Sequence, residues 1–155
     1  MNLAIKNKLK AIDFKMYIKY DAISLLALFV VQVFIGIFMS FSKTTDGTIG
    51  QTEMYLHSIP ILFMGMIGSP ILEEFIFRKY LWKKVISKRV KNIFLSALIT
   101  SLLFGMAHGF SNTIPLTATG LIFCFLYHKT GSIINNMFLH SIYNITLLLL
   151  YIAFL

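Results

Sequence analysis

Five runs of apolar residues follow one another along the chain, separated by short polar stretches. The runs cover about 22–41, 54–82, 93–108, 113–127 and 133–155. The first, second and last reach the roughly 20 residues that a helix needs to cross a bilayer. Backbone polar groups find no water inside lipid, so only helices and closed barrels span membranes. The pattern therefore predicts an all-α fold, a multi-pass transmembrane helix bundle with about five apolar segments.

The second run is too long for one upright span, because a helix over 54–84 would measure about 46 Å. Gly68-Ser69-Pro70 is the natural point for a break. Serine favours the N-cap position of a helix, and proline favours its first turn. The sequence therefore predicts a new helix that starts here and holds Glu73 and Glu74 in its first turns, where the positive helix end favours carboxylates.

The fourth run is short, about 22 Å as a helix against a hydrocarbon core of about 30 Å. Counting along the spans places His108 further out than Glu73 and His140. The short run draws the connection 109–112 inward, so we expect this connection to lie within the depth of the membrane and to line a cavity.

Composition agrees with a membrane protein, since 57% of the 155 residues are hydrophobic and only 13% are charged. The net charge of +8 is concentrated in the N-terminal residues and in the stretch 79–91. Because cytoplasmic loops carry the excess of lysine and arginine, we expect both segments inside and the loop 42–53 outside. Both basic segments flank apolar runs, which favours contact with lipid and argues against nucleic acid as a partner.

These observations give a domain organisation and a location. Residues 1–20 are predicted to be a basic cytoplasmic tail, part of it an interfacial amphipathic helix. Residues 21–155 are predicted to form a single transmembrane helical domain in a cell membrane. Cys124 is the only cysteine and lies in an apolar run, so we expect a packed thiol without a disulfide.

The chemistry of the chain centres on Glu73, Glu74 and Arg78. Ionisable residues at membrane depth are expensive and usually mark a functional site. Neighbouring side chains on a helix point about 100° apart, so the two carboxylates face different partners. Arg78 can pair with one of them. The other is then available as a general base that activates water.

Two further segments supply histidines. His108 ends the third run, and His140 and Asn144 lie on one face of the last run. With a glutamate, a histidine can activate water, while His140 and Asn144 can donate hydrogen bonds to an oxyanion. Alternatively, Glu73, His108 and His140 could hold Zn²⁺ with an open coordination position. A purely structural use, with Asn144 as a helix–helix contact, is the third option.

The ordered motifs Glu73-Glu74-x-x-x-Arg78, Phe104-x-x-x-His108 and His140-x-x-x-Asn144 resemble those of a known family. This is the CAAX protease and bacteriocin-processing enzyme (Abi, self-immunity) family of intramembrane endopeptidases. The resemblance implies that Glu73 and His108 activate water and that His140 and Asn144 stabilise the oxyanion. Glu74 and Arg78, with Phe104 beside the site, have supporting roles. Members often have about eight spans, so the shorter chain here suggests a minimal core or a homodimer.

The resulting hypothesis is a bacterial membrane endopeptidase that cleaves a peptide or membrane-associated precursor of the bacteriocin or pheromone type. One alternative is a self-immunity protein that acts by binding a bacteriocin or its receptor. Another is a structural or transport partner in which the polar cluster binds helices or ions. The residues alone leave the cofactor open, with zinc as the candidate metal.

Overall fold

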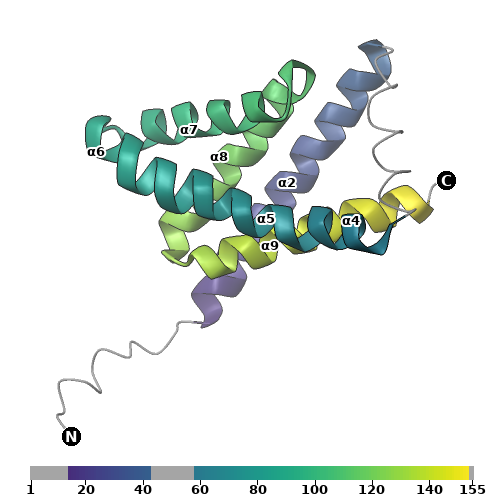
Figure 1. The fold of residues 1–155 in the computed structure, drawn as a ribbon, viewed down its shortest axis with the longest axis horizontal. Coiled ribbons are helices and arrows are strands. Elements are labelled where there is room, and N and C mark those ends of the chain that lie inside the picture. The colour runs from purple at the N-terminus through teal and green to yellow at the C-terminus, as the bar shows by residue number, and fades with distance from the viewer. Residues whose placement is uncertain (1–13, 43–57, 154–155) are drawn as a thin grey trace, which may run out of the picture.

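The computed structural model describes residues 14–42 and 58–153, and every regular element within these ranges is a helix (Figure 1). The predicted all-α bundle is confirmed. Residues 43–53 of the predicted outer loop and the first thirteen residues of the predicted tail lie outside the described residues. The helix α2 (Phe14–Ser42) begins within the predicted tail and continues through the first apolar run.

The second apolar run forms one long helix instead of the two that were predicted. It comprises α4 (Ile59–Phe63), η1 (Met64–Gly68), α5 (Ser69–Glu73), η2 (Glu74–Ile86) and α6 (Ser87–Arg89). The predicted break at Gly68-Ser69-Pro70 is wrong, because Gly68 and Ser69 keep right-handed helical angles. Pro70 has no N–H to donate, but a wider π-helical turn precedes it, in which the Ser69 N–H bonds to the Met64 carbonyl. Glu73 and Glu74 therefore lie in mid-helix, away from any stabilising helix end.

Three further helices complete the bundle. They are α7 (Ile93–Ala107), α8 (Thr113–Thr130) and α9 (Ile133–Ala153), with a short 3-10 turn η3 (Phe110–Asn112) before α8. Asn92 caps α7 by accepting a hydrogen bond from the Leu95 N–H at 2.9 Å. Gly131, with φ of 65°, ends α8 in the left-handed conformation and turns the chain into α9.

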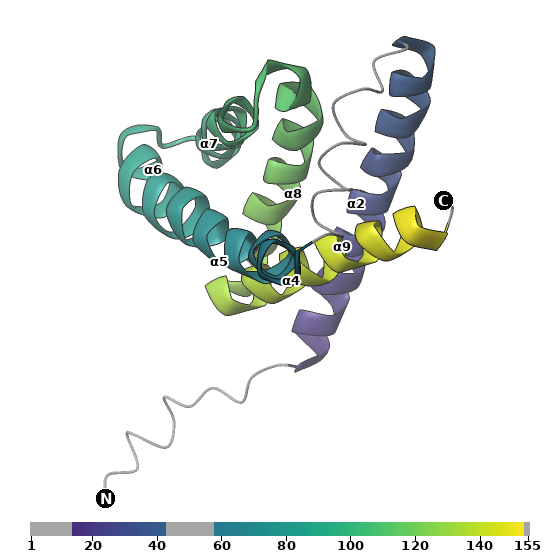
Figure 2. The ribbon, with the colours of Figure 1, turned by 45° about the vertical axis from the view of Figure 1, so that its right-hand side comes forward.

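The core has two parts. Leu28 of α2 packs with Phe123 and Leu126 of α8 and with Leu139 and Tyr143 of α9. A smaller cluster joins η2, α7 and α8. Figure 2 shows α9 crossing the long helix near α5, with α7 and α8 above α9 in this view; α9 also packs against α8.

The α7–α8 contact depends on two glycines. A Cβ on Gly105 would lie 2.4 Å from the Thr113 carbonyl oxygen, and one on Gly120 would lie 2.9 Å from the Ser101 Cβ. Small residues of this kind let membrane helices approach closely. The close approach fixes the end of α7, where His108 begins the turn towards η3.

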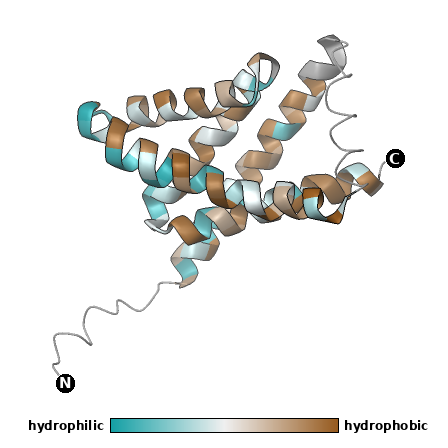
Figure 3. Cartoon of the chain, in the orientation of Figure 1, coloured by the Kyte–Doolittle hydropathy of each residue, from teal (hydrophilic) through white to brown (hydrophobic). Residues whose placement is uncertain are grey.

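Polar and apolar residues are distributed as in a membrane protein. Glu74, Arg78 and Asn136 are completely buried, whereas Phe34 is 69% and Phe94 is 68% exposed. Figure 3 shows hydrophobic residues along most of the length of the helices. Within the described residues, three helices are long and apolar enough to cross a membrane: 14–37, 59–89 and 133–153. The chain is therefore a multi-pass helical membrane protein.

Candidate active site

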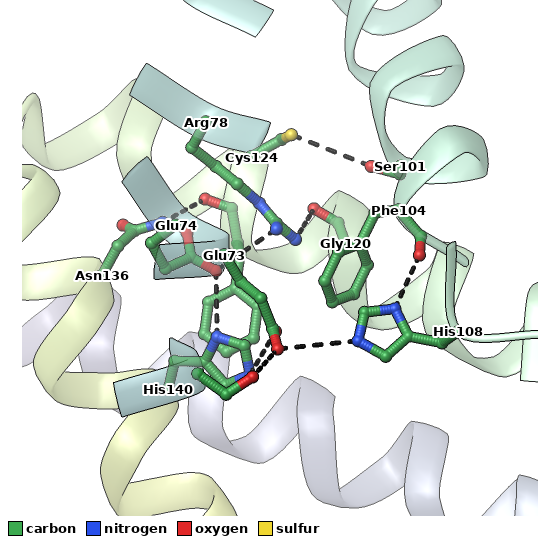
Figure 4. A network of polar contacts seen from close by, with 12 residues as sticks. Glu73, Glu74, Arg78, Ser101, Phe104, His108, Gly120, Cys124, Asn136 and His140 are labelled. Carbon is green, nitrogen blue, oxygen red and sulfur yellow. Dashed lines mark hydrogen bonds and ion pairs between the residues drawn. The ribbon is translucent and has the colours of Figure 1, made fainter. Parts of the chain in front are cut away.

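Glu74 lies at the centre of a buried polar network (Figure 4). Its Oε1 is 3.0 Å from the His140 Nδ1 and 3.3 Å from the Arg78 Nη1, and its Oε2 accepts a hydrogen bond from the Asn136 Nδ2 at 3.0 Å. The side chain is completely buried. A charge without water needs this many partners, because isolated burial is very unfavourable. Glu74 therefore joins the long helix to α9 by electrostatics.

Arg78 is held between aromatic rings on the other side of Glu74. Its guanidinium carbon lies 4.4 Å from the ring centre of Phe104 and 5.6 Å from that of Phe123. Its Nη2 donates to the Gly120 carbonyl at 3.4 Å. Cation–π contacts are strongest where water is excluded, as here. The arginine thus ties the long helix to α7 and α8.

Glu73 points in a different direction and reaches a more open part of the site. Its side chain is 18% exposed, and its carboxylate lies between two histidines. Oε1 is 3.6 Å from the His108 Nε2, and Oε2 is 3.8 Å from the His140 Nε2. The Ser69 hydroxyl, one helical turn earlier, donates to Oε1. The adjacent glutamates therefore have different surroundings: Glu74 is completely buried, whereas Glu73 is partly accessible.

The hydrogen-bond partner of Nδ1 fixes the orientation of both imidazole rings. The His108 Nδ1 lies 2.8 Å from the Phe104 carbonyl, and because a carbonyl only accepts, this nitrogen carries the proton. The His140 Nδ1 faces the Glu74 carboxylate in the same way. The Phe123 ring stacks on His140 at 4.4 Å and an interplanar angle of 27°. Both histidines consequently present Nε2 to Glu73.

The structure brings together most of the residues that the motifs predicted. Glu73, Glu74, Arg78, His108 and His140 form one connected cluster, and Phe104 packs against it. The expected difference in depth between His108 and the glutamates does not prevent their contact. The end of α7 simply lies against the middle of the long helix.

Asn144 is used differently from the prediction that it shares a site with His140. Its amide donates to the Gly65 carbonyl at 3.4 Å, in the π-helical turn before Pro70. An oxyanion-binding role for Asn144 stays a prediction, because it requires the amide to turn away from this carbonyl. The contact itself fits the helix–helix role that the sequence left open.

Asn136 is the member of the network that sequence reasoning missed. Its amide donates both to Glu74 and, at 2.8 Å, to the Phe123 carbonyl. Asn136 lies near the turn between α8 and α9 and belongs to none of the three motifs. Its spacing of four residues before His140 was the available signal, since that spacing puts both on one helix face.

The donor arrangement does not favour the zinc alternative. The two Nε2 atoms approach different oxygens of Glu73, so they flank the carboxylate and do not converge on one point. Within residues 14–42 and 58–153, no group of three or more His, Cys, Asp or Glu side chains is arranged to hold a metal ion. We therefore derive no chemical step through a metal.

The fold and the cluster define a class, a helical membrane protein in which two glutamates, an arginine and two histidines from different helices meet. The model of the family described as "Type II CAAX prenyl endopeptidase Rce1-like" matches residues 55–146. This range holds all three motifs and more than half of the chain. The chain belongs to this family, and the resemblance that the motifs predicted is confirmed.

Two bacterial relatives extend this result. The chain is 35% identical over 91 residues to "Putative membrane peptidase YdiL" of Bacillus subtilis (strain 168), covering 57% of this chain and 36% of the relative. It is 32% identical over 110 residues to "UPF0177 protein YxdF" of Lactococcus lactis subsp. lactis (strain IL1403), covering 67% of this chain and 58% of the relative. The chain thus matches less than two thirds of each relative's length. No solved structure matches it.

Proposed function

We propose that the chain is an intramembrane endopeptidase in which Glu73 and His108 activate a water molecule. The observation that carries the proposal is the position of the Glu73 carboxylate, partly exposed and flanked by two imidazole Nε2 atoms. Family membership and the printed name of the Bacillus relative support the peptidase class. Because Glu74 is completely buried, we assign the general base to Glu73.

The proposed reaction is hydrolysis of a peptide bond. A water molecule between Glu73 and the His108 Nε2 gives its proton to the carboxylate as its oxygen attacks the scissile carbonyl carbon. The proton then passes to the leaving nitrogen, and the C–N bond breaks. One water is consumed, and a carboxylic acid and an amine are formed.

His140 is suited to stabilise the oxyanion. It lies between Glu73 and Glu74, and Arg78 supplies one positive charge to the same cluster. The His140 Nε2 can donate a hydrogen bond to the developing negative oxygen while the Nδ1 stays on Glu74. Asn144 would be a second donor after release from the Gly65 carbonyl.

The substrate class follows from the surroundings of the site. The helices that supply Glu73 and His140 are candidate membrane spans. A polypeptide that reaches Glu73 is therefore itself membrane-embedded or held at the lipid surface. A bacteriocin or pheromone-type precursor fits this description and stays the proposed substrate.

The test compares the membrane peptides of one bacterial host that expresses the wild-type chain, Glu73→Gln or His108→Ala. New N-termini generated by the wild-type chain should fall by about 10²–10⁴-fold in both variants, the usual contribution of a general base. His128→Ala removes a histidine that lies outside the cluster and is the matched control. Cleavage that persists in both Glu73→Gln and His108→Ala would refute the proposal that this chain is the peptidase. Bacteriocin protection that persists without cleavage would favour the binding alternative.

A further inference from the structure

A groove lies between the long helix, α7 and α8, and neither glutamate is among its lining residues. We call it the Trp82 groove. Its walls include Trp82, Phe94, Ala97, Leu121, Phe125 and His128, and its volume is about 270 Å³. Phe94 is 68% exposed, so the groove opens on the outer face of the bundle. The wall side chains named here are apolar except for the imidazole of His128 and the indole N–H of Trp82.

The groove adjoins a strongly basic segment of the chain. We call this segment the basic loop, although all of its cations except Lys91 belong to the last turns of the long helix; its exposed cations are Lys83, Lys84, Lys88, Arg89 and Lys91. The loop follows Trp82 directly and ends two residues before α7 begins. Figure 3 shows the hydrophilic turn of α6 beside the more apolar α7. Apolar walls and concentrated positive charge therefore lie next to each other.

Residues 14–42 and 58–153 supply no carboxylate for these cations. Within the described residues, the acidic side chains are Asp21, Glu73 and Glu74. The two glutamates belong to the buried cluster, and Asp21 accepts a hydrogen bond from Asn135 at 2.6 Å. The positive charge of the basic loop is therefore available to an external anion.

A peptide is a poor occupant of the groove. Its backbone would need hydrogen-bond partners in an apolar channel. The indole N–H of Trp82 is already used, since it donates to the Ser96 hydroxyl at 2.9 Å. A hydrocarbon chain has no such requirement. The two features together match a molecule with an apolar chain and an anionic head.

We propose that the Trp82 groove binds an acyl chain of an anionic phospholipid and that the basic loop contacts its phosphate. Basic pockets between membrane helices recognise anionic headgroups in this way, and each cation near the surface strengthens binding about fivefold. A second hollow on α2, lined by Phe29, Val30, Val33 and Phe34, has no such charge among its lining residues and provides an internal comparison. The proposal does not depend on peptidase activity.

The test uses Trp82, the only tryptophan of the chain, as the probe. The full-length protein is reconstituted in phosphatidylcholine vesicles that contain increasing fractions of brominated phosphatidylglycerol or brominated phosphatidylcholine. We expect the anionic lipid to quench Trp82 fluorescence at a mole fraction several-fold lower than the zwitterionic lipid does. Equal quenching by the two lipids would overturn the proposal.

Two pairs of variants separate a site from diffuse attraction. Lys83→Gln/Lys91→Gln should reduce the preference for the anionic lipid by at least about fivefold. Lys15→Gln/Lys19→Gln removes the same charge from α2 and should leave the preference unchanged. If both double variants reduce the preference for the anionic lipid equally, the attraction is general to the protein surface and the proposed binding site is refuted.

A larger side chain in the wall of the Trp82 groove tests whether the acyl chain binds there. Leu121→Phe should reduce quenching by the brominated chain, while Val33→Phe in the hollow on α2 should not. Unchanged quenching in Leu121→Phe would show that the chain lies elsewhere. An acidic peptide that shifts Trp82 emission in phosphatidylcholine vesicles, where phosphatidylglycerol has no effect, would assign the surface to a protein partner.

Discussion

The same substitution should destabilise the protein far more at Glu74 than at Glu73. Glu74→Gln removes the carboxylate that pairs with Arg78, which is itself 1% exposed. Loss of one partner from a buried ion pair typically destabilises a protein by about 3–5 kcal/mol, because the other charge stays buried without compensation. Glu73 is 18% exposed, and its histidine contacts are 3.6 and 3.8 Å long. Glu73→Gln should therefore change stability by about 0–1 kcal/mol.

The measurement is unfolding in detergent micelles, followed by Trp82 fluorescence and far-UV circular dichroism. Glu74→Gln should unfold much more readily than Glu73→Gln, while both lose peptidase activity. Glu74→Gln/Arg78→Met removes both charges and should regain most of the lost stability, since well-packed apolar groups can replace a buried ion pair. Equal destabilisation by the two single variants, or no recovery in the double variant, would refute the assignment of a structural glutamate beside an accessible one.

Three further results are expected. Asn136→Ala leaves Glu74 short of one donor and should lower stability by about 1–3 kcal/mol together with activity, whereas Asn135→Ala should keep activity in the same cleavage assay. Gly105→Ala brings a Cβ to within 2.4 Å of the Thr113 carbonyl and should cost about 1–3 kcal/mol in detergent unfolding; Gly36→Ala, with nothing within 4 Å, is its control and should have a far smaller effect. Metal chelators should leave peptidase activity intact, and a stoichiometric metal lost together with activity would contradict this.

The family and the fold class could be predicted from the sequence because each depends on local pattern. Apolar run lengths identify membrane helices, since the thickness of the hydrocarbon core fixes the length of a span. The spacing in each motif places its polar residues about one turn apart on a helix. The spacing of four or five residues also predicted that Arg78 would pair with one of the glutamates.

The error at Gly68-Ser69-Pro70 shows where local pattern fails. Serine and proline favour a helix start, but a π-helical turn accommodates the missing N–H, and the helix continues through Pro70. The surrounding helices and the lack of water favour continued backbone hydrogen bonding over a break. Propensity alone does not contain this information.

The sequence by itself determined that Glu73, Glu74, His108 and His140 belong to one membrane-embedded set. Only the tertiary structure decided which glutamate is sealed and which is accessible. That difference arises because Glu74 faces Asn136 and Arg78 in the interior, while Glu73, turned by about 100° on the helix, faces the end of α7. The packing of separate helices sets these surroundings, and no spacing along the chain encodes it.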